Sequence, residues 1–134
     1  METGSIADDC QREVLKHKWI ESEKAGRDLG ASAEDDWARQ HWPRYWRTRW
    51  LEHMQGKRYW VELGQADFGV LRHQFHDQRL LLDRILDRVA AGMENLDIIC
   101  WAQEWGLNVD HVLAILEALD LNRRRVAYKQ RLLA

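Results

Sequence analysis

The chain has 134 residues, of which 46 % are hydrophobic, and its 20 basic and 22 acidic residues leave a formal net charge of −2. A chain of this length can bury a core without metal ions or disulfides. No apolar run approaches the roughly 20 residues that span a bilayer, and the first residues lack the charged-then-apolar pattern of a signal peptide. We therefore expect one cytoplasmic domain over residues 1–134, with a Trp/Arg-rich half (residues 1–66), a second half (residues 67–134) and no membrane contact.

Helices are expected throughout this domain. A single proline and long stretches of Glu, Lys, Arg, Leu and Ala predict an all-α fold, a compact bundle of five to six helices. The first helix is expected to begin at Asp8 or Asp9 and to end at Lys24, before the two glycines of AGRDLG. The residues predicted to face inward from it are Val14, Leu15, Trp19 and Ile20.

The next segment is interrupted by proline. Ser32 and Asp35 match the spacing in which side chains satisfy the free amides at a helix start, so Ser32 is predicted to cap the second helix. Pro43 lacks an amide hydrogen and suits the first turn of a helix, so we expect a kink or restart near residues 41–43 and a further helix over residues 43–55. The sequence YWVEL at residues 59–63 indicates a short extended segment.

The second half is predicted to open with a long helix. Asp67 is expected to cap this helix, which runs to Gly92. Its apolar positions keep a helical period, and they are Leu71, Phe75, Leu82, Ile85, Leu86 and Val89. Two further helices are expected over residues 95–105 and 108–119, followed by a basic helix in the tail.

Tryptophan is the most unusual feature of the composition. Five of the eight tryptophans lie within residues 37–60, where arginine is also frequent. Trp42, Trp46, Trp50 and Met54 recur every fourth residue, so they form one apolar ridge on a helix. This ridge is either the centre of the core or a docking surface. Eight tryptophans exceed what a core of this size ordinarily needs, and Trp and Arg are enriched at binding hot spots.

The ridge therefore predicts a non-enzymatic interaction or accessory protein that docks a protein partner or a second copy of itself. The residues expected to make the contact are Trp42, Tyr45, Trp46 and Trp50 as apolar anchors, with Arg47 and Arg49 as charged contacts. Single-stranded nucleic acid stacked on the tryptophans is a third interpretation, which the acidic remainder of the chain disfavours.

Charge is segmented along the chain. Residues 39–58 hold six bases and one acid, whereas residues 123–134 hold five bases and no acid. Such blocks are usually solvated or paired within the fold. The charged residues between Trp19 and Leu29 can form a local lattice of i,i+4 salt bridges that ends in a glycine cap. Alternatively, the carboxylates of Glu21, Glu23 and Asp28 receive the arginines of the Trp-rich helix, with Gly26 and Gly30 allowing another backbone to come close.

Residues 98–117 carry a second pattern. Ala102 lies in the middle of one predicted helix, Gly106 and Leu107 at the turn, and Val112 and Ile115 on the inward side of the next helix. This pattern resembles the helix-turn-helix family of DNA-binding domains. The resemblance implies, as the alternative function, a small DNA-binding regulator. Because the second helix has no positive charge, the contacts implied are Asn108 and His111 together with the basic tail, Arg123, Arg124, Arg125, Lys129 and Arg131.

Catalytic and metal motifs are weak. Glu13, His17 and Glu21 share one helical face, and His73 and His76 lie one turn apart beside Asp77, but each set supplies too few ligands. Cys10 and Cys100 lack neighbouring histidines, and no glycine-rich phosphate loop is present. We therefore expect no cofactor, no metal and no enzymatic activity.

Overall fold

The computed structural model of this protein describes residues 3–121. Its six α-helices are α1 (Ile6–Ala25), α2 (Ala31–Met54), α3 (Val70–Gln74), α4 (Arg79–Ala90), α5 (Asn95–Glu104) and α6 (Val109–Leu119). Two short strands, β1 (Thr3–Gly4) and β2 (Tyr59–Trp60), and the 3₁₀ helix η1 (Val61–Leu63) are the other regular elements of the described residues. The predicted all-α bundle is confirmed.

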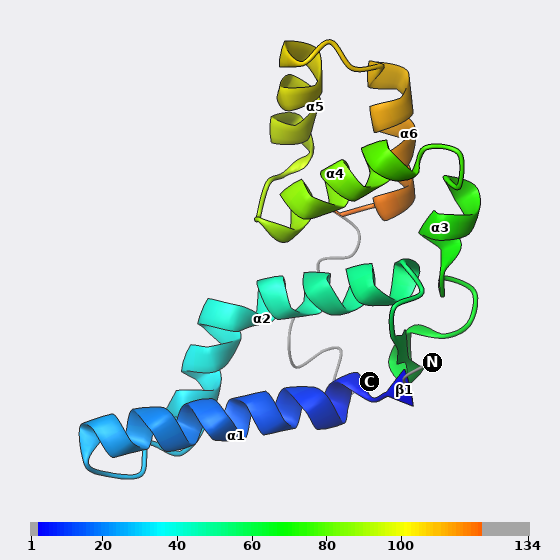
Figure 1. The fold of residues 1–134 in the computed structure, drawn as a ribbon. Coiled ribbons are helices and arrows are strands. Elements are labelled where there is room, and N and C mark those ends of the chain that lie inside the picture. Colours follow the sequence, from blue (N-terminus) through cyan, green and yellow to red (C-terminus); the bar gives the residue numbers. More distant parts are fainter. Residues whose placement is uncertain (1–2, 122–134) are drawn as a thin grey trace.

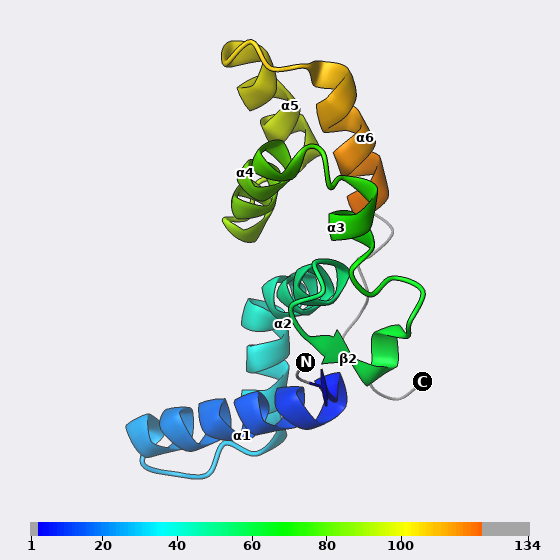
Figure 2. The ribbon, with the colours of Figure 1, turned by 45° about the vertical axis from the view of Figure 1, so that its right-hand side comes forward.

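The helices form two groups that meet along α2 (Figures 1 and 2). α1 lies beside α2 from its start as far as Arg49, and α4, α5 and α6 form a group next to the second half of α2, with α3 as the link. β1 pairs in parallel with β2, Thr3 opposite Tyr59 and Gly4 opposite Trp60. This pairing joins the beginning of the described chain to the segment that follows α2.

Two hydrophobic clusters correspond to these groups. The aromatic cluster consists of Ile6, Cys10, Val14, Trp37, Trp42, Trp46, Trp60 and Leu63. The aliphatic cluster consists of Leu51, Met54, Leu71, Phe75, Leu82, Ile85, Leu86, Val89, Ile98, Trp101, Ala102, Val112, Ile115, Leu116, Leu119 and Leu121. Trp50 packs against both clusters. The clusters therefore meet within α2, and residue 66 does not separate them.

α1 buries a narrower face than the sequence indicates. Ser5 caps its start, and Gly26 ends it with a left-handed φ of 69°. Ile6, Cys10 and Val14, which are four residues apart, face the aromatic cluster. Only Val14 of the predicted inward set is correct. The rest of the set, Leu15, Trp19 and Ile20, is exposed, because these side chains lie around the helix from the buried stripe.

α2 is one helix with Pro43 inside it. The predicted kink is visible in Figure 1, where α2 bends, but the predicted restart is wrong. Proline cannot donate to the carbonyl four residues earlier, so the helix bends there while packing on both sides preserves it. The predicted cap is also wrong, because α2 begins at Ala31 after Gly30 (φ 56°) and no side chain caps it.

The predicted long helix over residues 67–92 is in fact two helices. α3 follows Gly69 (φ 69°), so Asp67 is not its cap, and the chain leaves the helical conformation at Phe75 before α4 begins. Phe75 and Leu82 are seven residues apart, which is about two helical turns. Both residues can therefore face one core whether or not the helix is continuous, so the apolar period could not show the break.

Candidate docking site

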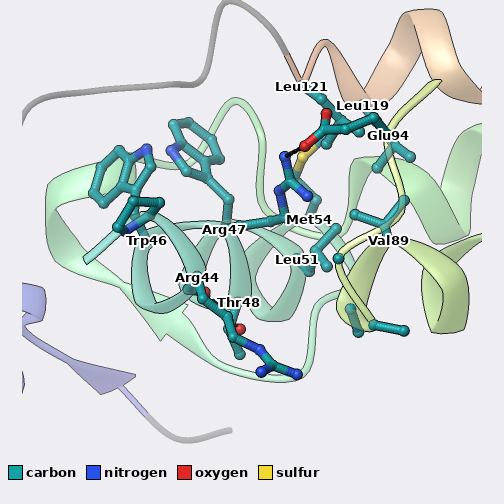
Figure 3. A pocket seen from close by; sticks show the side chains of 15 residues that line it. Arg44, Trp46, Arg47, Thr48, Leu51, Met54, Val89, Glu94, Leu119 and Leu121 are labelled. Carbon is teal, nitrogen blue, oxygen red and sulfur yellow. Dashed lines mark hydrogen bonds and ion pairs between the residues drawn. The ribbon is translucent and has the colours of Figure 1, made fainter. Parts of the chain in front are cut away.

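A hollow of about 550 Å³ lies between the two helical groups. One wall is the second half of α2, which contributes Pro43, Arg44, Trp46, Arg47, Thr48, Trp50, Leu51 and Met54. The other wall comes from the end of α4, the turn after it and the residues at the end of α6, and it contributes Val89, Ala90, Ala91, Gly92, Glu94, Leu119 and Leu121. Figure 3 shows this hollow from close by.

The hollow exists because large side chains face small ones. Trp46 and Trp50 meet edge to face at 5.8 Å on the α2 side. Ala90, Ala91 and Gly92 lie opposite and supply little side-chain volume. Met54, Val89 and Leu119 add apolar surface and belong to the aliphatic cluster. A largely apolar hollow of this size is within the range of roughly 300–1,000 Å³ that binding pockets occupy.

Charged side chains lie at the edge of the hollow. The Nη2 atom of Arg47 is 2.9 Å from Oε1 of Glu94, and these side chains are 18 % and 43 % exposed. Figure 3 shows Arg47 reaching from α2 to Glu94, while Arg44 points away from that pair. Arg44 is exposed and makes no ion pair with any residue among 3–121. One positive side chain at this edge therefore has no internal counter-charge among those residues.

The six residues predicted to make contact divide into two sets of three. Trp46, Arg47 and Trp50 line the hollow. Trp42, Tyr45 and Arg49 instead lie where α2 meets α1. Trp42 is 3 % exposed and stacks on Trp46 with ring centroids 5.4 Å apart. The first three residues line the candidate docking site, where Trp46, also 3 % exposed, is as buried as Trp42 and belongs to the same aromatic cluster; the other three lie against α1.

Tyr45 and Arg49 are held by the acidic start of α1. The hydroxyl of Tyr45 donates to Oδ2 of Asp9 at 2.6 Å, and Nη1 of Arg49 lies 3.5 Å from the same oxygen. Burial and the neighbouring Asp9 carboxylate raise the pKa of Tyr45, so its phenol stays neutral. Arg49 also pairs with Glu52, Nε to Oε1 at 2.5 Å. The predicted pairing of the acidic helix with arginine is therefore present.

The acceptor in that pairing differs from the prediction. It is Asp9 near the start of α1, whereas Glu21 pairs with Lys24 and Asp28 with Lys18. The expected close approach at Gly26 and Gly30 is also wrong, because a Cβ atom at either position would meet nothing within 4 Å. Both glycines have positive φ, which accounts for glycine at the two ends of the turn.

Sequence reasoning missed three features of the surface. Arg44 is the neighbour of the predicted contacts that has no ion pair within residues 3–121, and its place in a basic block was the available signal. The opposite wall, centred on residues 89–94, could not be predicted, because the sequence of α2 does not show which distant segment packs against it. The exposed tryptophans are Trp19 and Trp105, 67 % and 70 % exposed, neither of which was predicted to bind.

The helix-turn-helix-like corner is formed by α5 and α6. Ala102, Val112 and Ile115 are fully buried, and Gly106 takes the left-handed turn with a φ of 64°. Oδ1 of Asn108 accepts from the amide of His111 at 3.3 Å, so Asn108 caps α6. Asp110, His111 and Glu117 are exposed on α6. The basic residues Arg123, Arg124, Arg125, Lys129 and Arg131 lie outside the described residues.

The candidate metal ligands do not assemble. Nε2 of His17 lies 3.0 Å from Oδ2 of Asp36, and Nδ1 of His76 lies 3.1 Å from the carbonyl oxygen of His73. Within residues 3–121, no three His, Cys, Asp or Glu side chains are grouped as a metal ion requires. The helices of the same residues include none with both the length and the apolar character needed to cross a bilayer.

No protein-family model matches the chain, and neither a curated protein nor a solved structure matches it.

Proposed function

We propose that this chain is a non-enzymatic interaction protein of the cytoplasm, and that its hollow beside α2 receives apolar side chains of a protein partner. The observation that carries the proposal is the hollow itself, an apolar concavity with Trp46 and Trp50 on one wall and charged side chains at its edge. Aromatic and arginine side chains beside a desolvated pocket are typical of binding hot spots. The exposed free thiol of Cys100 is consistent with a reducing compartment.

Filling the hollow tests this proposal without removing core atoms. Ala91 is exposed at the end of α4 and lines the hollow, so we expect Ala91→Trp to place an indole over it. Ala114 is exposed on α6 and does not line the hollow, so Ala114→Trp is the matched control. A photo-crosslinking side chain at Thr48 should capture the partner in cells, and the purified partner should then bind wild type and Ala114→Trp but not Ala91→Trp. Equal binding by all three chains contradicts the proposal.

DNA binding is the second candidate, favoured by the packed corner of α5 and α6. The buried Ala102, Val112 and Ile115 and the turn at Gly106 have the arrangement that the family resemblance implies. The exposed acids of α6 oppose phosphate, so this function depends on the basic residues 123–131. Duplex binding that weakens with salt and is lost on replacing Arg123, Arg124 and Arg125 by Ala supports it. Absence of duplex binding at low salt excludes it.

A further inference from the structure

We infer that the partner segment is an acidic amphipathic helix, whose apolar side chains enter the hollow and whose carboxylates pair with Arg44. This inference rests on the proposed docking function and adds the chemical character of the partner. It follows from the Arg44 charge, which has no ion pair among residues 3–121, and from the elements that form the walls of the hollow.

Most arginines of the basic block are occupied within the fold. Arg39 pairs with Asp36, Arg47 with Glu94, and Arg49 with Asp9 and Glu52. The Arg58 guanidinium lies 4.3 Å from the ring centroid of Trp60. Arg44 alone of the five arginines in residues 39–58 has no such partner among residues 3–121, and it lies at the hollow.

An incoming carboxylate would complete this edge. Charge-assisted hydrogen bonds between guanidinium and carboxylate are stronger than hydrogen bonds between neutral groups. They become stronger still when an apolar contact beside them excludes water. An incoming lysine or arginine would instead meet Arg44 with like charge, because Arg47 is already paired with Glu94. The edge of the hollow therefore selects an acidic partner over a basic one.

The walls of the hollow favour a helix as the occupant. Both walls are built largely from helices, and the strands β1 and β2 pair with each other and do not line the hollow. An extended peptide would find no strand edge to extend, whereas a helix can insert side chains three and four residues apart into one groove. The tail at residues 123–134 is a poor occupant, since it has five bases and no acid.

Two labelled peptides provide the test, used with the full chain. One is a helical Leu/Ala/Glu sequence of about 16 residues, roughly 24 Å of helix, and the other has Lys in place of every Glu. Fluorescence anisotropy at low and physiological salt should show the Glu peptide binding at least about tenfold more tightly than the Lys peptide. Arg44→Glu should reverse this order. Arg39→Glu changes the same charge on the same helix, outside the hollow, and should preserve the order.

The other possible outcomes distinguish a failure of the docking function from a failure of the preference for an acidic partner. If both peptides bind equally and Ala91→Trp blocks both, the docking function stands and the acidic preference is wrong. A Glu peptide with Ser at every Leu position that binds as well as the original shows that the hollow is not used, which overturns the inference. Self-association of the chain that Ala91→Trp abolishes makes a second copy the occupant, which also overturns it. If neither peptide binds and the Ala91→Trp chain still binds its partner, the inference and the docking function both fail.

Discussion

The two clusters that meet on α2 are built in different ways. The aromatic cluster uses a few large rings, and polar side chains such as Tyr45, Arg49 and Asp9 lie against it with hydrogen bonds and ion pairs. The aliphatic cluster takes mostly smaller side chains from the five helices α2 to α6, together with Phe75 and Leu121 just after α3 and α6. Large rings bury much surface at few positions, but they leave space where a neighbour is small. The hollow lies at this junction, with Trp46 and Trp50 facing Ala90, Ala91 and Gly92.

This difference shows that a regular sequence pattern can change its role along one helix. Trp42, Trp46, Trp50 and Met54 are evenly spaced, yet Trp42 is enclosed by the aromatic cluster and Met54 by the aliphatic cluster. Trp50 contacts both clusters and also lines the hollow. The ridge therefore packs into the core along its whole length, while Trp46, Trp50 and Met54 also line the hollow.

The largest expected effect comes from removing a ring of the aromatic cluster. Trp60 is fully buried, so Trp60→Ala should lower the free energy of unfolding by about 4 kcal/mol, through lost burial and a residual cavity. Urea denaturation measures this change. Trp105→Ala removes the same side chain from an exposed site and should change stability by less than about 0.5 kcal/mol. Similar losses in the two variants would contradict the placement of these rings.

Removing an aliphatic side chain should act on the other half of the molecule. Ile115 is fully buried, and Ile115→Ala should cost about 3 kcal/mol. Amide hydrogen exchange distinguishes the two regions, because local opening follows the weakened contacts. We expect Ile115→Ala to accelerate exchange most in α5 and α6, and Trp60→Ala to accelerate it most in α1 and the segment after α2. Identical exchange patterns would show that the clusters open as one unit.

His53 joins the end of α2 to the segment that follows it. It is fully buried, its Nδ1 accepts from the amide of Trp60 at 3.0 Å, and its Nε2 donates to the carbonyl of Gly64 at 2.6 Å. His53→Leu should cost about 3 kcal/mol, because it strands a buried donor and a buried acceptor. Thermal denaturation measures the loss. His73→Leu, at an exposed position, is the control, and an equal effect would refute the role of this side chain.

Much of this fold could be predicted, and strong local signals explain which parts. The helix predicted over residues 108–119 matches α6 almost to the residue, because its apolar period is regular; Asn108, named from the sequence only as a DNA contact, caps it. The helix predicted over residues 95–105 also matches α5, and the structure shows a local start signal that the prediction did not use, the reciprocal capping box of Glu94 and Asp97. The end of α1 at Gly26 has an equally local cause. These features require only neighbours in sequence.

The errors arise where distant contacts decide the structure. Trp19 is apolar but exposed, because the stripe from Ile6 to Val14 takes the space against α2. His53 was missed because its partners, Trp60 and Gly64, are brought near only by the turn after α2. The hollow was not predicted from the sequence, although three of the residues expected to make contact line one of its walls. Trp46, Arg47 and Trp50 come from one helix, whereas the facing wall comes from residues about forty or more positions later.

Glu62 of η1 joins the segment after α2 to the start of α1, and it should make the stability of the fold depend on pH. It accepts from the Ser5 hydroxyl and the Ile6 amide, each at 2.7 Å, and from the Ala7 amide at 3.0 Å. Burial would raise the pKa of Glu62, but these hydrogen bonds outweigh burial and hold its pKa below the usual 4.5. The folded state therefore favours the carboxylate, and its contribution is lost as pH falls through this lowered pKa.

Glu62→Gln isolates that contribution. Near neutral pH the substitution should cost about 1 kcal/mol, as for the loss of a helix N-cap. The difference between wild type and variant should shrink as pH falls below the ordinary pKa of 4.5, because the unfolded wild type then binds a proton that the folded carboxylate resists. Denaturant unfolding at pH values above and below 4.5 measures it. Glu104→Gln, at an exposed site, is the control. A difference that stays constant with pH would contradict the proposed capping.

The smallest stability change is expected at the junction of the two clusters, in the Arg47–Glu94 pair. Both side chains are partly exposed, so Glu94→Gln should alter the free energy of unfolding by about 0.5 kcal/mol, while the amide oxygen can still cap α5. Binding should change more, because Arg47 loses its internal counter-charge and can pair with an incoming carboxylate. We expect the Glu peptide to bind severalfold more tightly to Glu94→Gln than to wild type, as measured by anisotropy.

Asp97→Asn is the matched control. It changes the same charge at the start of α5 without lining the hollow, and it should leave peptide affinity nearly unchanged. An equal gain in affinity in both variants would mean that the loss of one negative charge near the start of α5 is enough to strengthen binding, and that Arg47 does not contact the peptide.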